Sequence, residues 1–366
     1  MSLADTAATV AGVVALSEFE SLARAVMDPA AFDYVAGGAW DELSLGEAEA
    51  AWRRRRLRPR VLVDVSRIDP STTMAGARSA LPIGIAPMAA HGLAHPDAEP
   101  AVARAAAAAD IPFTASTMST VPMEEIAAAA PDATRWFQLY TQADPGRTQS
   151  LVERAEAAGF RAILLTVDLP TLGYRERDLR SGFDLSVPHG NFIDAGPDHA
   201  SHDGTLEGGY DLISETIDRG LAWDDLRAMR SWSSLPILLK GILTAEDARL
   251  AIDHGVDGIV VSNHGSGQLD RTIKTADALE EVVAAVDGRL EIWVDGGIRR
   301  GLDVVTALAL GARGVLVGRP ILYALAAAGE AGVTRALEIL RQETILAMTL
   351  LGAPTVADLT RDRVAG

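Results

Sequence analysis

The chain has 366 residues, of which 48% are hydrophobic and none is cysteine. A chain of this length and composition can bury either one large α/β core or two smaller ones. Its formal net charge of −17 argues against nucleic acids and anionic membranes as partners, because both attract positive surfaces. The absence of cysteine excludes disulfides, thiolate catalysis and cysteine-bound metals.

The N-terminal residues do not match a targeting or anchoring segment. No stretch of the sequence approaches ~20 uninterrupted apolar residues, so we predict no transmembrane helix. Residues 1–16 are rich in apolar side chains, but no Lys or Arg precedes Arg24, and a secretory signal peptide opens with basic residues. We therefore expect a cytoplasmic enzyme in which residues 1–16 form a flexible or helical leader and residues 17–366 form a single domain.

Short apolar runs recur along the chain, and each ends near a polar or glycine-rich loop. We predict strands at Pro82–Ala86, Pro112–Ala115, Trp136–Tyr140, Ala162–Val167, Pro236–Lys240, Gly258–Val261, Ile292–Val294 and Gly314–Val317. Alanine-rich stretches with charges at helical spacing predict helices between them, among them Glu99–Ala109, Ser150–Ala158, Ala245–His254, Ala276–Val286 and Asp303–Leu310. Strands that alternate with helices indicate a parallel sheet, and eight of them favour a closed (β/α)8 TIM barrel, here preceded by an N-terminal helical segment.

One long insert interrupts this rhythm after the fourth strand. Between Val167 and Pro236 no further barrel strand is evident, and residues 182–220 are rich in Gly, Asp, His and Pro. A loop of this length within a compact domain is usually a lid, a binding element or disordered. We predict that residues 182–220 form an active-site lid; the alternative is a surface excursion without a role.

A run of arginines, Arg53–Arg56 with Arg58 and Arg60, has the composition of a nucleic-acid patch. In so acidic a chain we interpret it as a solvated or subunit-facing segment that pairs with carboxylates. The sequence contains no P-loop and no Gly-x-Gly-x-x-Gly after a strand, which argues against a Rossmann nucleotide site. His199 and His202 lack a third residue at a suitable spacing, so no metal site is predicted.

The most informative segment is Gly258–Asp270, which reads GIVVSNHGSGQLD. An apolar run typical of a buried parallel strand ends on a polar loop with His264, and barrel enzymes carry their catalytic residues at this end of the strands. The segment resembles the active-site signature of the FMN-dependent 2-hydroxy acid oxidases and dehydrogenases, Ser-Asn-His-Gly-small-Arg-Gln. That family includes glycolate, lactate, mandelate and 4-hydroxymandelate oxidases. One position departs from the signature, because Gly267 stands where the family has an arginine that binds the substrate carboxylate.

Two glycine-rich loops predict an anion site. Asp295–Arg299 (DGGIR) follows the seventh strand and Gly318-Arg319 follows the eighth, which is where such barrels usually bind phosphate. Glycines let backbone N–H groups approach an anion, and arginines supply bidentate charge. These residues alone imply a phosphorylated ligand. The family resemblance, which extends over nearly the whole chain, implies the FMN phosphate at Gly297, Arg299, Gly318 and Arg319, with Asp295 near the ribityl chain.

Lys240 closes the fifth strand, and a lysine at a barrel mouth is costly unless a ligand charge pairs with it. The resemblance implies that Lys240 lies beside flavin N1 and the C2 carbonyl, where it stabilises the negative charge of the reduced ring. It also implies flavin contacts by Pro87, Met88, Ala89, Ser116, Gln138, Thr166 and Ser262.

The same resemblance assigns the reaction centre. His264 matches the catalytic base, which removes either the hydroxyl proton or the α-carbon proton while a hydride equivalent passes to flavin N5; imidazole suits this because its pKa lies near operating pH. Asp168 matches the carboxylate that stabilises the imidazolium, and Tyr140 matches a tyrosine near the substrate hydroxyl. Tyr34 and Arg175 match the residues that bind the substrate carboxylate, next to Gly267.

The default prediction is oxidation of an aryl 2-hydroxy acid of the mandelate type to the 2-oxo acid by a homotetrameric enzyme. Ala89, where the family's oxidases tend to have alanine, favours O2 as the electron acceptor. Loss of an arginine contact to a carboxylate typically weakens binding by ~1.5–3 kcal/mol. Gly267 therefore leaves three alternatives open: a substrate without a free carboxylate, such as an ester, amide, carrier-linked acid or other alcohol; an ordinary oxidase that has lost its arginine; or a non-catalytic FMN-binding barrel. A relative of the type 2 isopentenyl diphosphate isomerases is a minor fourth.

Overall fold

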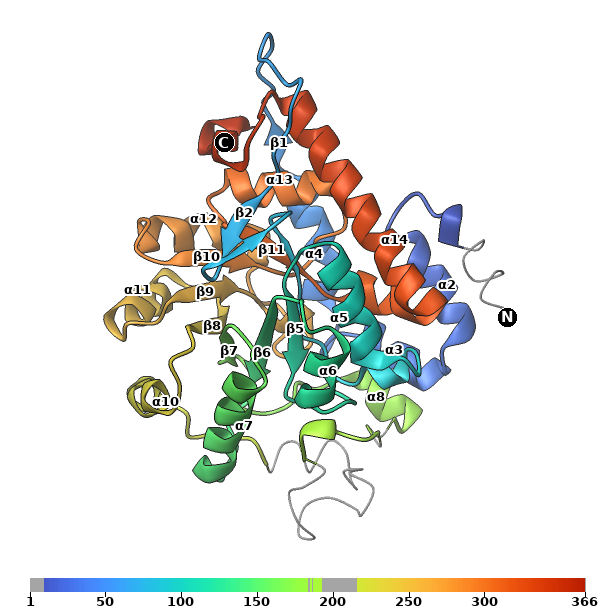
Figure 1. The fold of residues 1–366 in the computed structure, drawn as a ribbon, viewed down its shortest axis with the longest axis vertical. Coiled ribbons are helices and arrows are strands. Elements are labelled where there is room, and N and C mark those ends of the chain that lie inside the picture. Colours follow the sequence, from blue (N-terminus) through green and yellow to red (C-terminus); the bar gives the residue numbers. More distant parts are fainter. Residues whose placement is uncertain (1–9, 184, 186, 193–215, 366) are drawn as a thin grey trace.

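Eight parallel strands close into a barrel in the computed structural model, which describes residues 10–183, 185, 187–192 and 216–365 (Figure 1). Neighbouring strands follow the order β10-β11-β4-β5-β6-β7-β8-β9. The predicted (β/α)8 barrel is confirmed, and each predicted strand corresponds to one of the eight. Their bounds are β4 (Ile83–Ile85), β5 (Phe113–Ser116), β6 (Arg135–Leu139), β7 (Ile163–Thr166), β8 (Ile237–Ile242), β9 (Gly258–Val261), β10 (Glu291–Val294) and β11 (Gly314–Val317).

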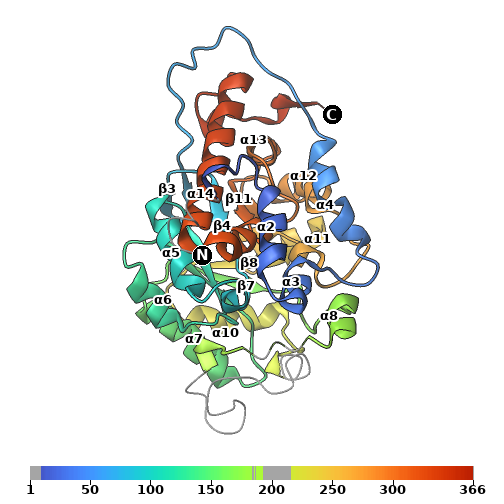
Figure 2. The same cartoon turned by 90° about the vertical axis from the view of Figure 1, so that its right-hand side faces the viewer.

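Helices surround the barrel and connect its strands (Figures 1 and 2). Helix α7 begins at Pro145 and not at the predicted Ser150, because Pro145 occupies the first helical turn and Asp144 accepts a hydrogen bond from the Gly146 amide. The helices between and after the strands are α5 (Ala98–Ala108), α6 (Met123–Ala129), α7 (Pro145–Ala157), α10 (Leu226–Trp232), α11 (Ala245–Asp253), α12 (Thr275–Val286), α13 (Gly301–Ala309) and α14 (Arg319–Leu351).

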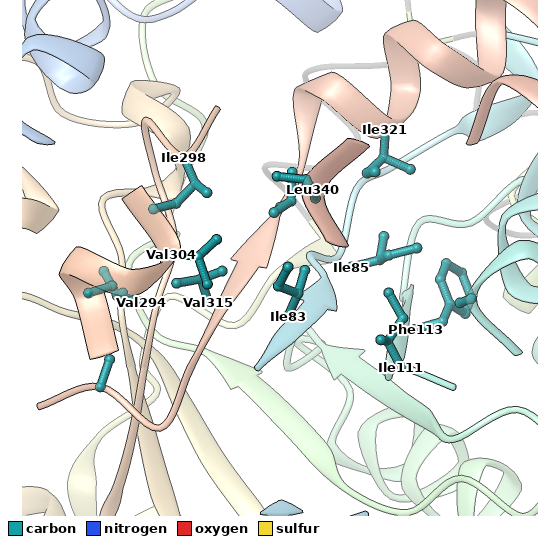
Figure 3. Packing of buried hydrophobic residues seen from close by; sticks show 14 of the residues in the cluster. Ile83, Ile85, Ile111, Phe113, Val294, Ile298, Val304, Val315, Ile321 and Leu340 are labelled. Atoms are coloured by element: carbon teal, nitrogen blue, oxygen red, sulfur yellow. The ribbon is translucent and has the colours of Figure 1, made fainter. Parts of the chain in front are cut away.

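Residues on each strand alternate between two cores. Leu164 of β7 points into the barrel, whereas its neighbour Leu165 packs in the outer layer between strands and helices. Inside the barrel Trp136 and Trp293 meet edge to face, with ring centroids 5.6 Å apart. Both sides of every strand are thus buried, which explains why the strands read as continuous apolar runs. Figure 3 shows the outer layer, where strand residues such as Ile83, Ile85, Val294 and Val315 face Val304, Ile321 and Leu340 of the helices.

An N-terminal layer packs beside the end of the chain. It consists of α2 (Glu18–Val26), α3 (Pro29–Ala36) and α4 (Leu43–Arg53), with α2 against α14. The predicted leader, residues 1–16, is described only from residue 10. Val10, Val13 and Leu16 are buried in the outer core, and Arg335 of α14 donates two hydrogen bonds to the Val13 carbonyl. This part of the expected leader therefore packs onto the barrel and does not lie free of it.

The insert after β7 is described at its two flanks. Helix α8 (Glu176–Ser181) precedes it, and Asn191 donates hydrogen bonds to the carbonyls of Ser116 and Thr117. Residues 193–215, with 184 and 186, lie outside the described residues, as do His199 and His202, so the lid remains a proposal.

The arginine run lies at the end of α4 and in the strand that follows, β1 (Arg56–Leu57), which pairs with β12 (Val364–Ala365). Arg54 and Arg55 pair with Asp277, and Arg60 pairs with Asp362, so these arginines have carboxylate partners within the chain. Over the described ranges, no helix combines the length and apolar character needed to cross a membrane.

Candidate active site

A cavity lies at the carboxyl ends of the barrel strands. The structure brings together there most of the residues that the sequence singled out. They are Tyr34, Pro87, Met88, Ala89, Ser116, Gln138, Tyr140, Thr166, Arg175, Lys240, His264, Gly267, Asp295, Gly318 and Arg319. Asp168 and Ser262 lie directly behind this lining, in contact with His264 and Lys240 respectively. Gly297 and Arg299 face helix α4 instead, as described below.

His264 is held between a carboxylate and a hydroxyl. Its Nδ1 lies 2.8 Å from Oδ1 of Asp168, and its Nε2 lies 3.3 Å from the hydroxyl of Tyr140. Burial raises the pKa of Asp168, but the neighbouring His264 and Lys240 outweigh it and the net pKa is lowered. An ionised carboxylate only accepts hydrogen bonds, so Nδ1 carries the proton and Nε2 is the nitrogen available to the cavity.

The backbone at the histidine is strained. His264, Gly265 and Ser266 have φ values of 57°, 60° and 63°, three consecutive left-handed residues in the short turn η4 (His264–Ser266). A left-handed conformation costs ~1–2 kcal/mol for a residue with a Cβ. Hydrogen bonds hold the turn in place: the His264 amide donates to Ser262 Oγ at 3.1 Å, and the Gly267 amide donates to the His264 carbonyl at 3.1 Å. Such strain persists where the surroundings fix it, and it is common at functional sites.

A bulge in β8 positions Lys240. The pairing of β8 with β9 is irregular between Lys240 and Ile242, and Gly241 between them has φ +119°. A Cβ at Gly241 would lie 2.6 Å from the Cβ of Asp168, so only glycine lets β8 pass this close to the carboxylate. Bulges of this kind redirect a neighbouring side chain.

Lys240 is a buried cation with two polar partners. Its Nζ lies 3.2 Å from Oδ2 of Asp295 and donates to Ser262 Oγ at 2.9 Å. Burial lowers the pKa of Lys240, but the neighbouring Asp295 and Asp168 raise it by more than burial lowers it. The net pKa is therefore raised, and the ammonium stays charged.

Three polar side chains form a chain of hydrogen bonds along neighbouring strand ends. Ser116 Oγ donates to Gln138 Oε1 at 3.0 Å, and Gln138 Nε2 donates to Thr166 Oγ1 at 3.0 Å. Ser116 and Gln138 are direct partners in the β5–β6 register, so they lie at the same height in the barrel. These three side chains present hydrogen-bond donors and acceptors to the cavity, an arrangement that suits the polar edge of a planar ligand ring.

The two glycine-rich loops after β10 and β11 differ in their contacts. A Cβ at Gly297 would lie 2.5 Å from the Ala48 carbonyl of α4, and Arg299 Nε lies 3.1 Å from Glu49 Oε1. Neither residue is among those that line the cavity. Arg319, the first residue of α14, does line it, and burial lowers the pKa of its guanidinium to about 10. Within the described part of the chain, no carboxylate oxygen forms an ion pair with Arg319.

The substrate end contains Tyr34, Arg175 and Gly267. The Arg175 guanidinium lies 5.5 Å from the Tyr34 ring centre, and its Nε donates to the Gly267 carbonyl at 3.1 Å. Gly267 has φ −87°, so the backbone does not require glycine here. A Cβ at this position would lie 3.1 Å from Arg175 Nη2, so the glycine gives the guanidinium room to approach the backbone. Burial raises the pKa of Tyr34, which keeps its hydroxyl protonated.

An apolar wall completes this end, and sequence reasoning missed it. Met118, Leu169, Leu172 and Leu185 all line the cavity. The signal for two of them was present, because Leu169 and Leu172 lie between Asp168 and Arg175 in one loop. Met118 and Leu185 carry no such signal, since each reaches the site from a separate loop.

The cavity fits a ligand with a phosphate, a hydroxyl-bearing linker and a polar ring. Arg319 is a buried cation beside the N-terminus of a helix, where anions bind. Asp295 Oδ1 is buried and, as far as the described residues show, accepts no hydrogen bond, which suits the hydroxyls of a linker. Hydrogen-bond partners for the edge of a ring come from Ser116, Gln138 and Thr166. A fixed positive charge comes from Lys240. Fold and site together define a TIM-barrel protein whose cavity suits a phosphorylated ring cofactor.

Comparison with known proteins identifies the family. Residues 23–366 match the family model described as FMN-dependent dehydrogenase, and the chain belongs to this family. It is an FMN-dependent α-hydroxy acid oxidoreductase. Glycolate oxidase 1 of Zea mays is 48% identical over 353 residues, which cover 95% of this chain and 94% of the relative. Glycolate oxidase of Spinacia oleracea is 45% identical over 354 residues, covering 96% and 95%. A crystal structure of mandelate oxidase with (S)-4-hydroxymandelic acid superposes with a TM-score of 0.90 at 44% identity, covering 96% of this chain and 98% of that one.

Proposed function

We propose that this enzyme oxidises 2-hydroxy acids with an aromatic or other bulky apolar side chain, of the mandelate type, and transfers the electrons to O2. The observation that carries the proposal is the imidazole of His264, fixed by Asp168 with Nε2 facing the cavity beside the apolar wall of Met118, Leu169, Leu172 and Leu185. An apolar wall of this kind gains more from a phenyl ring than from the hydrogen of glycolate.

The geometry of the cavity supports a role for each residue. FMN, when bound, supplies the acceptor for a hydride equivalent from the substrate carbon. His264 takes the proton at Nε2, from either the hydroxyl or the α-carbon, and Asp168 stabilises the imidazolium that forms. Burial and the nearby Asp168 raise the pKa of Tyr140, so its hydroxyl remains a donor that orients the substrate oxygen.

Three further cavity residues have roles: two hold the substrate and one favours the reduced cofactor. Arg175 and Tyr34 bind the carboxylate through a guanidinium and a protonated hydroxyl. Lys240 would supply a positive charge that stabilises the negative charge of the reduced ring when FMN is bound.

A second candidate function takes substrates without a free carboxylate. Its support is the backbone of Gly267, which engages Arg175 and presents no side-chain charge of its own. A site with two arginines favours a free carboxylate strongly over a neutral group. With Arg175 alone this preference is smaller, so esters, amides or diols with the same apolar side chain compete better with the acid.

We also propose an assembly and a cellular location. A homotetramer is the expectation that the resemblance gives, and a cytoplasmic location agrees with the formal charge of −17. Size-exclusion chromatography with light scattering tests the first, and fractionation of the source cells tests the second.

Anaerobic titration of the FMN-loaded enzyme separates the two candidate substrates. Mandelate and 4-hydroxymandelate are compared with methyl mandelate, mandelamide and styrene glycol, with lactate and glycolate as small acids, by the loss of flavin absorbance. Bleaching by the aromatic acids at the lowest concentrations supports the first proposal. Bleaching by the neutral compounds alone supports the second, preference for glycolate contradicts the apolar wall, and no bleaching contradicts both. Readmission of air then measures reoxidation by O2, and a flavin that stays reduced would contradict the oxidase assignment.

A further inference from the structure

We propose that Arg319 is a positioning residue. Its guanidinium connects residues 35–37, which follow Tyr34, to the turn η4, which contains His264. The same guanidinium also faces the phosphate end of the cavity. Cofactor binding and assembly of the substrate site are thereby coupled through one side chain. The inference rests on the proposed function in taking Tyr34 and His264 as substrate and base residues, whereas the contacts of Arg319 do not depend on it.

Three hydrogen bonds connect this guanidinium to two distant parts of the chain. Nε donates to the Val35 carbonyl at 2.8 Å and Nη2 to the Gly37 carbonyl at 2.6 Å. Nη1 donates to the Gly265 carbonyl at 2.8 Å. Val35 directly follows Tyr34, and Gly265 directly follows His264. A movement of the guanidinium is therefore transmitted to both residues.

Both attachment points need an external donor. Val35 and Gly37 lie at the C-terminal end of α3, where the last carbonyls of a helix have no partner within it and a cation is favoured. Gly265 is the middle residue of the left-handed turn η4, and a strained turn persists only where its surroundings hold it. A Cβ at Gly265 would lie 2.9 Å from Arg319 Nη1, so the glycine also permits the close approach of the guanidinium.

A direct hydrogen bond also joins the two segments. The Ala39 amide donates to the Ser266 carbonyl at 3.0 Å, so residues 35–39 are connected to residues 265–266 both directly and through Arg319. Because arginine has five N–H groups and three are used here, one on each terminal nitrogen remains to face an anion. A phosphate bound there would fix the guanidinium, and with it both segments.

Arg299 is the matched control. It belongs to the other anion loop, but its guanidinium bonds to Glu49 and to the Ile298 carbonyl and touches neither the Tyr34 segment nor the histidine turn. Lysine keeps the charge at either position. At 319 a single ammonium cannot span three carbonyls as the planar guanidinium does.

The test is amide hydrogen exchange of the FMN-loaded protein, saturated with FMN, for the wild type, Arg319→Lys and Arg299→Lys. We expect Arg319→Lys to accelerate exchange at Ala39 and Gly267 by about tenfold or more, while the barrel strands keep their protection. Arg299→Lys, at a side chain that lies against Glu49, should leave these amides protected. Unchanged exchange in Arg319→Lys, or equal acceleration in both variants, would overturn the proposal.

Two more measurements test the proposal, and the first uses only the wild type, so it applies even if Arg319→Lys folds poorly or loses FMN. In the wild-type holoenzyme, the amides of Ala39 and Gly267 should open with the same free energy, and protection factors that differ by more than about tenfold contradict the connection. Stopped-flow reduction of Arg319→Lys by (S)-mandelate at saturating FMN should show both a higher dissociation constant and a slower limiting rate. If wild-type flavin is not reduced by mandelate, the proposed substrate fails, while the exchange results still decide the role of Arg319.

Discussion

Nδ1 of His264 lies 2.8 Å from Oδ1 of Asp168, although 96 positions separate the two residues in the chain. The contact arises because β7 and β9 both flank β8, so the loops that follow them meet above the bulge at Gly241.

Replacement of His264 by Ala removes the proton acceptor and leaves the flavin site intact. We expect FMN to remain bound while flavin reduction by substrate slows by roughly 10²–10⁴-fold. Anaerobic stopped-flow absorbance measures this, and reduction at the wild-type rate would show that His264 is not the base.

Asp168→Asn tests the orientation of the imidazole. An amide can donate its N–H to Nδ1, which moves the imidazole proton to Nε2 and removes the base from the cavity side. We expect the reduction rate to fall by about 10²-fold or more, with little change in FMN affinity. Asp168→Glu serves as the control, since it keeps the charge and should retain more activity than Asp168→Asn. Equal losses in the two variants would mean that the position of the carboxylate matters and its charge does not.

The lowered pKa of Asp168 also predicts how stability depends on pH. The carboxyl has a lower pKa in the folded protein than in the unfolded chain, so its ionisation stabilises the fold above the unfolded value of about 3.9. This contribution is lost as the pH falls through the folded value. The difference in unfolding free energy between the wild type and Asp168→Asn should therefore be constant near neutral pH and shrink below about pH 4. Urea unfolding of the FMN-loaded proteins over this range measures it, and a difference that grows on acidification would contradict the assignment.

Gly241→Ala tests the bulge in β8. Alanine at φ +119° is strained, and its Cβ would lie 2.6 Å from that of Asp168. We expect a loss of unfolding free energy of about 1–3 kcal/mol and slower flavin reduction, because relief of the contact must move Asp168 or Lys240. Gly255→Ala is the control: Gly255 also has positive φ, but a Cβ there meets no atom within 4 Å. Loss of stability alone in both variants would show that the bulge does not position the reacting groups.

The barrel was predictable from local sequence patterns, whereas the residues of the proposed reaction centre were assigned through the family resemblance. A strand buried on both faces is a continuous apolar run, so β4 to β11 were visible, and His264, Asp168 and Lys240 each follow or close such a run. The attachment of Arg319 to Val35 was not predictable, since 284 positions separate them and any carbonyl accepts a guanidinium equally well. For the same reason nothing in the sequence placed Arg299 beside Glu49.

Gly267→Arg decides between the two candidate substrates. If the enzyme oxidises hydroxy acids with a weakened carboxylate site, a second guanidinium should raise kcat/KM for mandelate, by about 10-fold or more for ~1.5–3 kcal/mol of added binding. If the natural substrate is neutral, the same change should lower kcat/KM for methyl mandelate, because the new side chain fills the space beside the substrate carbonyl. Any side chain at this position crowds Arg175, whose Nη2 would lie 3.1 Å from the Cβ. Gly267→Ala therefore serves as the control: a loss common to Ala and Arg reports displacement of Arg175, and only the difference between the two variants reports the added charge. If Gly267→Arg gains nothing over Gly267→Ala with mandelate, the free carboxylate is not what this site is built to bind.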